Sequence, residues 1–421
     1  MTTDATIDTL PTHALADGSG TLLQLVRSGR ASTISELAAA MGVSRSTAIQ
    51  RIDFLVAHGL IASQAAVAGS RGRPAALARF NPGAGIVLAA QIGISGCRIA
   101  ATDLAGAVLA EGYLTVELAT GPHALLTDLE DAFDRMRAGL PGTPVVGMGV
   151  GIPNDIELAN YARGLGLSGT GWDREYFRSN LREHFDAPVF VDLDVNLIAL
   201  AEWRKSWPDV EVFVCVKLGT LLNAAIIVNG VPVRGVSGLA GELGHIKVNG
   251  ATEACSCGGV GCLDAVASGS ALVRQLAEAG LDVEHVSDVV RLAQQAEPRA
   301  VHAVREAGRR IGEALASVVN LLNPAVIATW GYLTEAETPL FAGMREGSIR
   351  WPSPDRASAS RSSAPPSATS PARAEPRCAS STRCSIRQPS TGCSWPGRGP
   401  PRGRRPHSAL RADRRTIADR E

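Results

Sequence analysis

The chain lacks net charge, a long apolar run and a recognisable export signal. Its 41 basic residues balance its 41 acidic residues, so overall charge does not indicate nucleic acid as a partner. It contains no run of about eighteen apolar residues, the length that a membrane-spanning helix needs. The N-terminus is polar and acidic, which is not typical of a secretory signal. We therefore predict a cytoplasmic protein without a membrane segment.

Length and composition divide the chain unevenly. At about 150 residues per domain, 421 residues predict two or three domains. From about Ser348, Ser, Pro, Arg and Ala dominate, and residues 351–421 hold 14 arginines against 5 acidic residues. We predict that residues 348–421 are disordered, with neither helix nor strand, as a frame-shifted C-terminus would be. The alternative is a basic arm that binds DNA. The start, residues 1–18, is also predicted to be disordered.

Three of the eight cysteines lie close together in the sequence and follow a histidine. One imidazole and three thiols within eighteen residues are sufficient for a tetrahedral zinc site, and the intervening glycines let the backbone fold back on the ion. The predicted ligands are His245, Cys255, Cys257 and Cys262. Four protein ligands leave no position open for water, so we expect one structural Zn²⁺ per chain. The alternative is a disulfide with a spare thiol, which is less compatible with a chain that lacks a secretory signal.

Residues 19–82 are predicted to form three short helices and a hairpin. The first helix covers Gly20–Val26, the second follows a capping box formed by Thr33 and Glu36, and the third begins at Ser44. Helix, glycine turn and helix, followed by two extended segments with a cationic tip, is the outline of a winged helix-turn-helix. This pattern favours DNA binding.

The polar residues of the third helix and the hairpin tip are the candidate DNA contacts. Short polar and cationic side chains on such a helix can reach base edges and phosphates in the major groove, and arginines at the tip can enter a narrow minor groove. The predicted contacts are Ser44, Arg45, Ser46, Thr47, Gln50, Arg51, Arg71 and Arg73. The alternative for the helix is an ordinary solvated face.

The remaining residues up to about 347 alternate between predicted strands and helices. Residues 86–100 predict two strands joined by a tight turn, and Val145–Gly151 predicts a buried parallel strand. Ligands gather beyond the carboxyl ends of such strands, which makes Asn154 a candidate ligand contact, although a solvated turn is an equally good interpretation. Further helices are predicted at about Leu197–Trp203 and Asp264–Ala279.

The segment around the zinc ligands resembles a family signature. Gly-Glu-x-Gly-His at 241–245, followed by Cys-x-Cys-Gly-x-x-Gly-Cys-Leu-acid at 255–264, resembles the zinc motif of the ROK family, which contains bacterial sugar kinases and sugar-responsive repressors. The resemblance extends from about Ser19 to about Gly347. It implies an N-terminal winged helix-turn-helix at 19–82 and a two-lobed α/β body with the actin-like ATPase fold, with lobes at 84–195 and 196–347.

The resemblance also implies the sugar contacts. Glu242 and His245 match family residues that touch a sugar, and Asp194 matches the carboxylate that serves the kinases as general base. The family's preceding Asn is Leu193 here, and its usual Glu is Asp264, a shorter acid that still reaches a hydroxyl in this interpretation. The alternative for Asp194 is a helix-capping carboxylate. The predicted sugar contacts are Asn154, Asp194, Glu242, His245 and Asp264.

The same comparison argues against nucleotide chemistry. Gln91 replaces the acid of the kinases' first phosphate motif, Leu221 and Asn223 replace glycines that let backbone N–H groups hold phosphate, and Trp330 replaces a glycine on the adenosine side. We predict a repressor of carbohydrate genes that binds operator DNA and a small sugar, forms a homo-oligomer and is not an enzyme. The alternatives are an ATP-dependent sugar kinase and a DNA-binding protein that no longer responds to a ligand.

Overall fold

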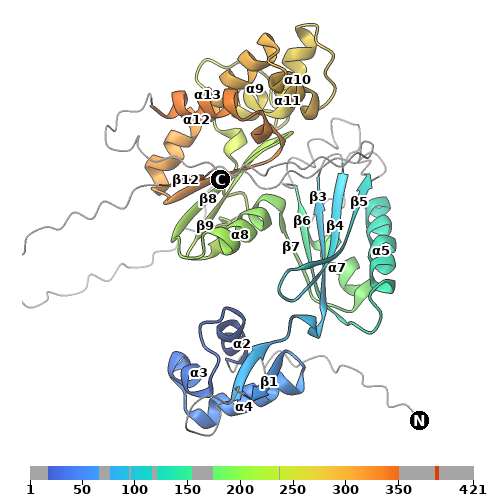
Figure 1. Cartoon of the computed structure of the whole chain (residues 1–421). Coiled ribbons are helices and arrows are strands. Elements are labelled where there is room, and N and C mark those ends of the chain that lie inside the picture. The colour runs from blue at the N-terminus through green and yellow to red at the C-terminus, as the bar shows by residue number, and fades with distance from the viewer. Residues whose placement is uncertain are drawn as a thin grey trace, which may run out of the picture.

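The computed structural model describes residues 18–65, 76–93, 96–115, 121–153, 174–236, 238–349 and 385–387. Figure 1 shows three bodies: a small N-terminal head in blue, a first lobe in cyan to green, and a second lobe in green to orange. No helix of the described part is both long and apolar enough to cross a bilayer.

The head consists of three helices and an antiparallel hairpin. Its elements are α2 (Ser19–Arg27), α3 (Ile34–Met41), α4 (Arg45–Ala57), β1 (Ile61–Ala65) and β2 (Ala76–Phe80). The predicted capping box is present, because Thr33 accepts from the backbone N–H of Glu36 while the Glu36 carboxylate accepts from the N–H of Thr33. Leu22, Leu37 and Leu55 are fully buried where the helices meet. The helices therefore form where the apolar pattern predicted them.

The first lobe is a five-stranded sheet with helices packed on one face. After a short 3₁₀ turn, η1 (Pro82–Ala84), its elements are β3 (Ile86–Ile92), β4 (Gly96–Asp103), β5 (Val108–Thr115), α5 (Pro122–Ala138), β6 (Val145–Ile152), α7 (Arg174–Phe185) and β7 (Val189–Leu193). The strand order is β5-β4-β3-β6-β7. The central strand β3 pairs antiparallel with β4 and parallel with β6, and β6 pairs parallel with β7. Phe133 of α5 and Phe177 of α7 are fully buried in the same core cluster.

The second lobe repeats this plan. Its elements are α8 (Asp194–Ser206), β8 (Val212–Leu218), β9 (Leu222–Val228), β10 (Val231–Pro232), η3 (Leu243–His245), α9 (Leu263–Ala267), α10 (Gly269–Glu278), α11 (Val286–Gln294), α12 (Pro298–Leu322), β11 (Val326–Trp330), η4 (Tyr332–Ala336) and α13 (Thr338–Ile349). The sheet order is β10-β9-β8-β11-β12, again with an antiparallel neighbour on one side of the central strand and a parallel one on the other. The repeated strand pattern confirms the predicted two-lobed α/β architecture.

Two helix boundaries differ from the prediction. The helix expected at Asp264–Ala279 is two helices, because Ser268 adopts an extended conformation and its hydroxyl caps α10 by accepting from the N–H of Ala271. The helix expected from Leu197 begins at Asp194. This earlier start places the Asp194 carboxylate at the junction between β7 and α8.

The prediction that nothing ordered follows residue 348 was wrong in two places. Helix α13 continues to Ile349, and Ser385–Arg387 form a strand, β12, that pairs antiparallel with Val326–Ala328 of β11. The unpaired N–H and C=O groups of an edge strand accept an extended segment of almost any sequence, so composition gave no signal for this pairing. The remaining residues of 350–421 lie outside the described part.

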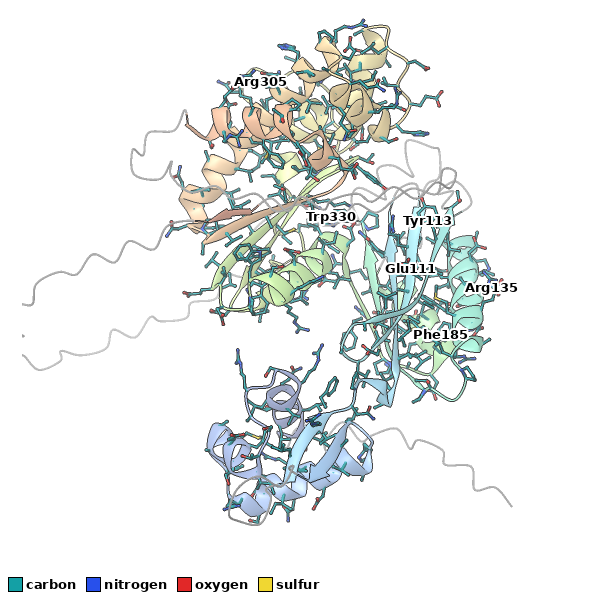
Figure 2. The ribbon with its side chains drawn as sticks, in the orientation of Figure 1. Glu111, Tyr113, Arg135, Phe185, Arg305 and Trp330 are labelled. Atoms are coloured by element: carbon teal, nitrogen blue, oxygen red, sulfur yellow. The ribbon has the colours of Figure 1, made fainter. Side chains whose placement is uncertain are left out.

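Helix α13 was not predicted, and it packs on α12 with the two backbones in contact. A Cβ at Gly312 would overlap the carbonyl of Met344, and one at Gly343 would overlap the carbonyl of Arg305. Salt bridges from Arg305 to Glu346 and within α12 lie along the same outer surface, where Figure 2 labels Arg305. Such close packing requires glycine, and glycine lowers the helix propensity of the segment, which is why α13 was not predicted.

Candidate metal centre, sugar contacts and nucleic-acid face

The predicted metal ligands come together in the structure. The ligand atoms of His245, Cys255, Cys257 and Cys262 all lie within 4.8 Å of one another. His245 Nδ1 is 3.7 Å from Cys255 Sγ, and Cys257 Sγ is 3.7 Å from Cys262 Sγ. Zn–S bonds of about 2.3 Å in a tetrahedron separate sulfur ligands by roughly 3.8 Å. The cluster therefore fits a tetrahedral ion, and all three cysteines are free thiols, which contradicts the disulfide alternative.

Short β-bridges hold the loop in which these ligands lie. Lys247 forms a bridge with Cys262, and Ala254 forms one with Val260, so the segment between them folds back on itself. The Lys247 ammonium is 3.1 Å from Cys262 Sγ and donates to the Val260 carbonyl at 2.7 Å. The hydrogen bond to Cys262 raises the pKa of Lys247. A cation at this position offsets the negative charge that the sulfurs carry when they bind a metal.

His245 offers one ring nitrogen to the cluster and a second to the interior. Its Nδ1 lies beside Cys255, whereas its Nε2 is buried and has no hydrogen-bond partner among the described residues. Buried polar atoms are rarely left without a partner. The imidazole is therefore positioned to connect the metal loop with a bound group on its other side.

Asp194 is buried and ion-paired. Its side chain is 4% exposed, and its Oδ2 lies 2.5 Å from the ammonium of Lys217, which is 21% exposed. The N-cap of α8 is Leu193, which makes no side-chain cap, and Asp194 is the first residue of the helix. The Asp194 carboxylate therefore pairs with Lys217 and is not the N-cap of the helix. Sequence analysis missed Lys217, although a lysine within the apolar strand Val-Phe-Val-Cys-Val-Lys-Leu is a recognisable signal.

A second acid at the same junction is also paired. Asp192 Oδ2 accepts from Arg234 Nη2 at 2.6 Å and from Arg234 Nε at 2.9 Å. Its Oδ1 accepts from the backbone N–H of Leu193 and from the Asn196 amide. Both buried acids at the β7–α8 junction are therefore neutralised by cations from the second lobe. The sequence pattern gave no indication of the Arg234 pair.

The other predicted sugar contacts have different surroundings. Asp264 is buried, and its Oδ1 accepts from the backbone N–H of Leu222 at 2.8 Å. Burial raises the pKa of Asp264 to about 6, while the bond from Leu222 acts in the opposite direction. Glu242 directly precedes η3 and is half-buried. Asn154 lies outside the described residues.

Three backbone N–H groups around the turn between β8 and β9 bond within the protein. The N–H of Gly219 donates to the Leu221 carbonyl, and that of Leu222 donates to Asp264. The N–H of Ala224 donates to the Gly241 carbonyl and to the side chain of Asn223. The N–H groups of Gly219, Leu222 and Ala224 are therefore not available to bind a phosphate.

Trp330 lies beside Lys217 in the neighbouring strand, on the side of the second lobe nearer the first lobe (Figure 2).

The predicted DNA contacts on α4 divide into three groups. Arg45, Ser46 and Gln50 are exposed. Thr47 and Arg51 are half-buried, and the Arg51 guanidinium lies against Gly18. The Ser44 hydroxyl caps the helix by accepting from the N–H of Thr47 at 3.1 Å, which limits its reach toward a partner. The same helix exposes Ile49 and Asp53, which the sequence analysis did not single out. Arg71 and Arg73 lie outside the described residues.

The chain is similar to one protein family and to curated repressors and kinases. The family model described as "ROK family" matches residues 87–350. The chain is 27% identical over 301 residues to a xylose repressor of Caldicellulosiruptor bescii, covering 68% of this chain and 75% of the relative. It is 28% identical over 276 residues to a glucokinase of Halalkalibacterium halodurans, covering 61% of this chain and 83% of the relative.

The structure is also similar to a solved structure over more of the chain than the family model matches. A ROK family transcriptional regulator, described as a homologue of the E. coli MLC protein, superposes with a TM-score of 0.67 at 24% identity and covers 80% of this chain and 88% of its own. That coverage exceeds the part of the chain that the family model matches, so the likeness of fold includes residues beyond 87–350.

Proposed function

Because the chain belongs to the ROK family, we propose that it is a sugar-responsive transcriptional repressor of carbohydrate genes. Residues 19–82 form its winged helix-turn-helix, and the lobes at 84–195 and 196–347 form its effector body. The observation that supports this most is the head itself, in which α4 presents Arg45, Ser46 and Gln50 to solvent beside a hairpin. Operator DNA is the partner of this face.

The sugar site of this proposal includes Asn154, Asp194, Glu242, His245 and Asp264. The buried Nε2 of His245 is its best-supported contact, because this nitrogen has no described protein partner and a sugar hydroxyl would supply one. Asp194 and Asp264 already have protein partners in this structure, so a sugar shares them or replaces those partners.

The metal of this proposal is one structural Zn²⁺ held by His245, Cys255, Cys257 and Cys262. The donor set and its spacing support zinc, which would keep the three sulfurs deprotonated and fix the orientation of the imidazole. Lys247 contributes a compensating positive charge next to Cys262. His245, which belongs to both the metal ligands and the sugar contacts, thereby joins the loop at 245–262 to the sugar site.

The proposed repressor does not phosphorylate its sugar. A general base must be free to accept a proton from a sugar hydroxyl, whereas the carboxylate of Asp194 is engaged by Lys217. Phosphate binding requires free backbone donors, whereas the N–H groups of Gly219, Leu222 and Ala224 around the β8–β9 turn already bond within the protein. The chain's likeness to a glucokinase makes an active kinase the rival function.

Sugar and DNA are coupled in this proposal through the arrangement of the two lobes. A sugar changes DNA affinity only if it binds one arrangement better than another, and DNA must then change sugar affinity by the same factor. A homo-oligomer, dimer or tetramer, would present a pair of heads, or two pairs, to a symmetric operator.

The test is recovery of genomic DNA fragments by the purified full-length protein, repeated with each of a panel of hexoses, pentoses and N-acetyl sugars. We expect fragments upstream of carbohydrate genes, released by one class of sugar. Parallel incubation with ATP should give no sugar-dependent ADP. Fragments that no sugar releases would indicate a ligand-blind regulator, and sugar-dependent ADP would indicate a kinase.

A further inference from the structure

Helix α4 exposes a large apolar side chain on the face that we assign to DNA. Ile49 is 41% exposed, whereas Ala48 and Leu55 on the core side are 0% and 1% exposed. A single exposed apolar residue is ordinary on a protein surface, so exposure alone is not informative. Ile49 is, however, directly followed by Gln50 and lies one turn after Arg45 and Ser46, all of them exposed.

The charges of the head are compatible with a DNA partner for this face. Residues 19–82 hold seven arginines and two acidic residues, whereas the whole chain has no net charge. One of the two acids, Glu36, accepts from the backbone N–H groups of Ser32 and Thr33. Asp53 is the other, and it is exposed three residues after Gln50. Its charge disfavours close approach to phosphates, so the N-terminal half of α4 is the part that enters the groove.

The chemistry of Ile49 and Gln50 matches one kind of base pair. The C5-methyl group of thymine is the apolar feature of the major groove, and a glutamine amide can bond both N7 and N6 of adenine. An A·T pair presents both features. We propose that Ile49 packs on a thymine methyl while Gln50 bonds an adenine, so that these two neighbours set a preference of the operator for A·T within each half-site. This inference rests on the proposed function.

The test removes a single methyl group from the DNA. In a fragment recovered by the full-length protein, each thymine is replaced in turn by deoxyuridine, which keeps base pairing and lacks the methyl. For the wild-type protein we expect one position in each half-site at which affinity falls about fourfold, as the loss of one buried methyl predicts. Ile49→Ser should bind the thymine and deoxyuridine duplexes equally. Gln50→Ala should keep the deoxyuridine effect and lose discrimination at the adenine.

Val56 provides a matched control. It is 38% exposed and lies two turns after Ile49 on the same side of α4, beyond the half that enters the groove. Val56→Ser should keep both the affinity and the deoxyuridine effect. A wild-type protein that binds the fragment without any deoxyuridine effect, or an Ile49→Ser variant that retains it, overturns the inference and leaves the proposed function standing. A protein that recovers no fragment at all overturns both.

Discussion

The ammonium of Lys217, at the end of the central strand of the second lobe, lies 2.5 Å from Oδ2 of the buried Asp194. The pair joins β8 to the start of α8, at a carboxylate that we propose as a sugar contact. A buried carboxylate paired with a cation stabilises the β7–α8 junction, and removing either partner alone leaves an uncompensated charge.

Lys217→Met should therefore destabilise the protein by about 3 kcal/mol, the usual cost of breaking a buried ion pair. Urea-induced unfolding measures the change. The double variant Lys217→Met, Asp194→Asn removes both charges and should recover a large part of the loss. Equal stability of Lys217→Met and the wild type would mean that the pair does not form in solution.

Metal retention should depend on Lys247 as well as on the four ligands. Cys257→Ser should lose zinc under gentle dialysis, because three donors remain. Lys247→Met should release zinc to a colorimetric chelator faster than the wild type, since the charge that offsets the thiolates is gone, whereas Lys247→Arg should resemble the wild type. Release of zinc from Lys247→Met at the wild-type rate would exclude this role for the ammonium.

The outer surface of α12 predicts an acid-dependent contribution to stability. Hydrogen bonds from Arg309, and further contacts with Arg310, lower the pKa of Glu306 to about 2. A carboxylate whose folded-state pKa is depressed stabilises the fold above its unfolded pKa, near 4.5, and loses this contribution as pH falls toward 2. Glu306→Gln should therefore be less stable than the wild type at pH 7, and the difference should shrink near pH 3.

Glu284 is the control for this measurement, because it is exposed and takes part in none of the ion pairs found among the described residues. Glu284→Gln should match the wild type at both pH values. A Glu306→Gln deficit that is the same at pH 7 and pH 3 would be inconsistent with the titration of this carboxylate.

The contact between α12 and α13 predicts that a single methyl group is not tolerated at Gly312. Gly312→Ala would place a Cβ on the carbonyl of Met344, so the helices must separate, and we expect a loss of about 1–3 kcal/mol, as overpacking typically costs. Gly20→Ala is the matched control, because a Cβ at Gly20 of α2 meets nothing within 4 Å and alanine favours the helix. Thermal unfolding should separate the two variants, and a Gly312→Ala midpoint at or above that of Gly20→Ala would contradict the packing.

Sequence alone was sufficient for the parts that depend on local chemistry. The capping box at Thr33, the alternation of strands and helices and the ligand set at 245–262 are encoded over short distances, and the structure contains each of them. The pairing of long-range partners was not predictable. A lysine within an apolar strand marks Lys217 as unusual, but nothing in the sequence pairs it with Asp194, or Arg234 with Asp192. The backbone contact of α12 with α13 and the pairing of β12 also depend on tertiary structure.

The central claim is that a sugar bound in the body changes the affinity of the head for DNA without phosphoryl transfer. Its most direct test is fluorescence anisotropy of a recovered operator duplex, titrated with full-length protein in the absence and presence of the sugar that released the fragment. We predict a Kd that rises about 5- to 150-fold with the sugar, the usual range of coupling between two sites. An unchanged Kd with every sugar of the panel, together with consumption of ATP, would contradict the account.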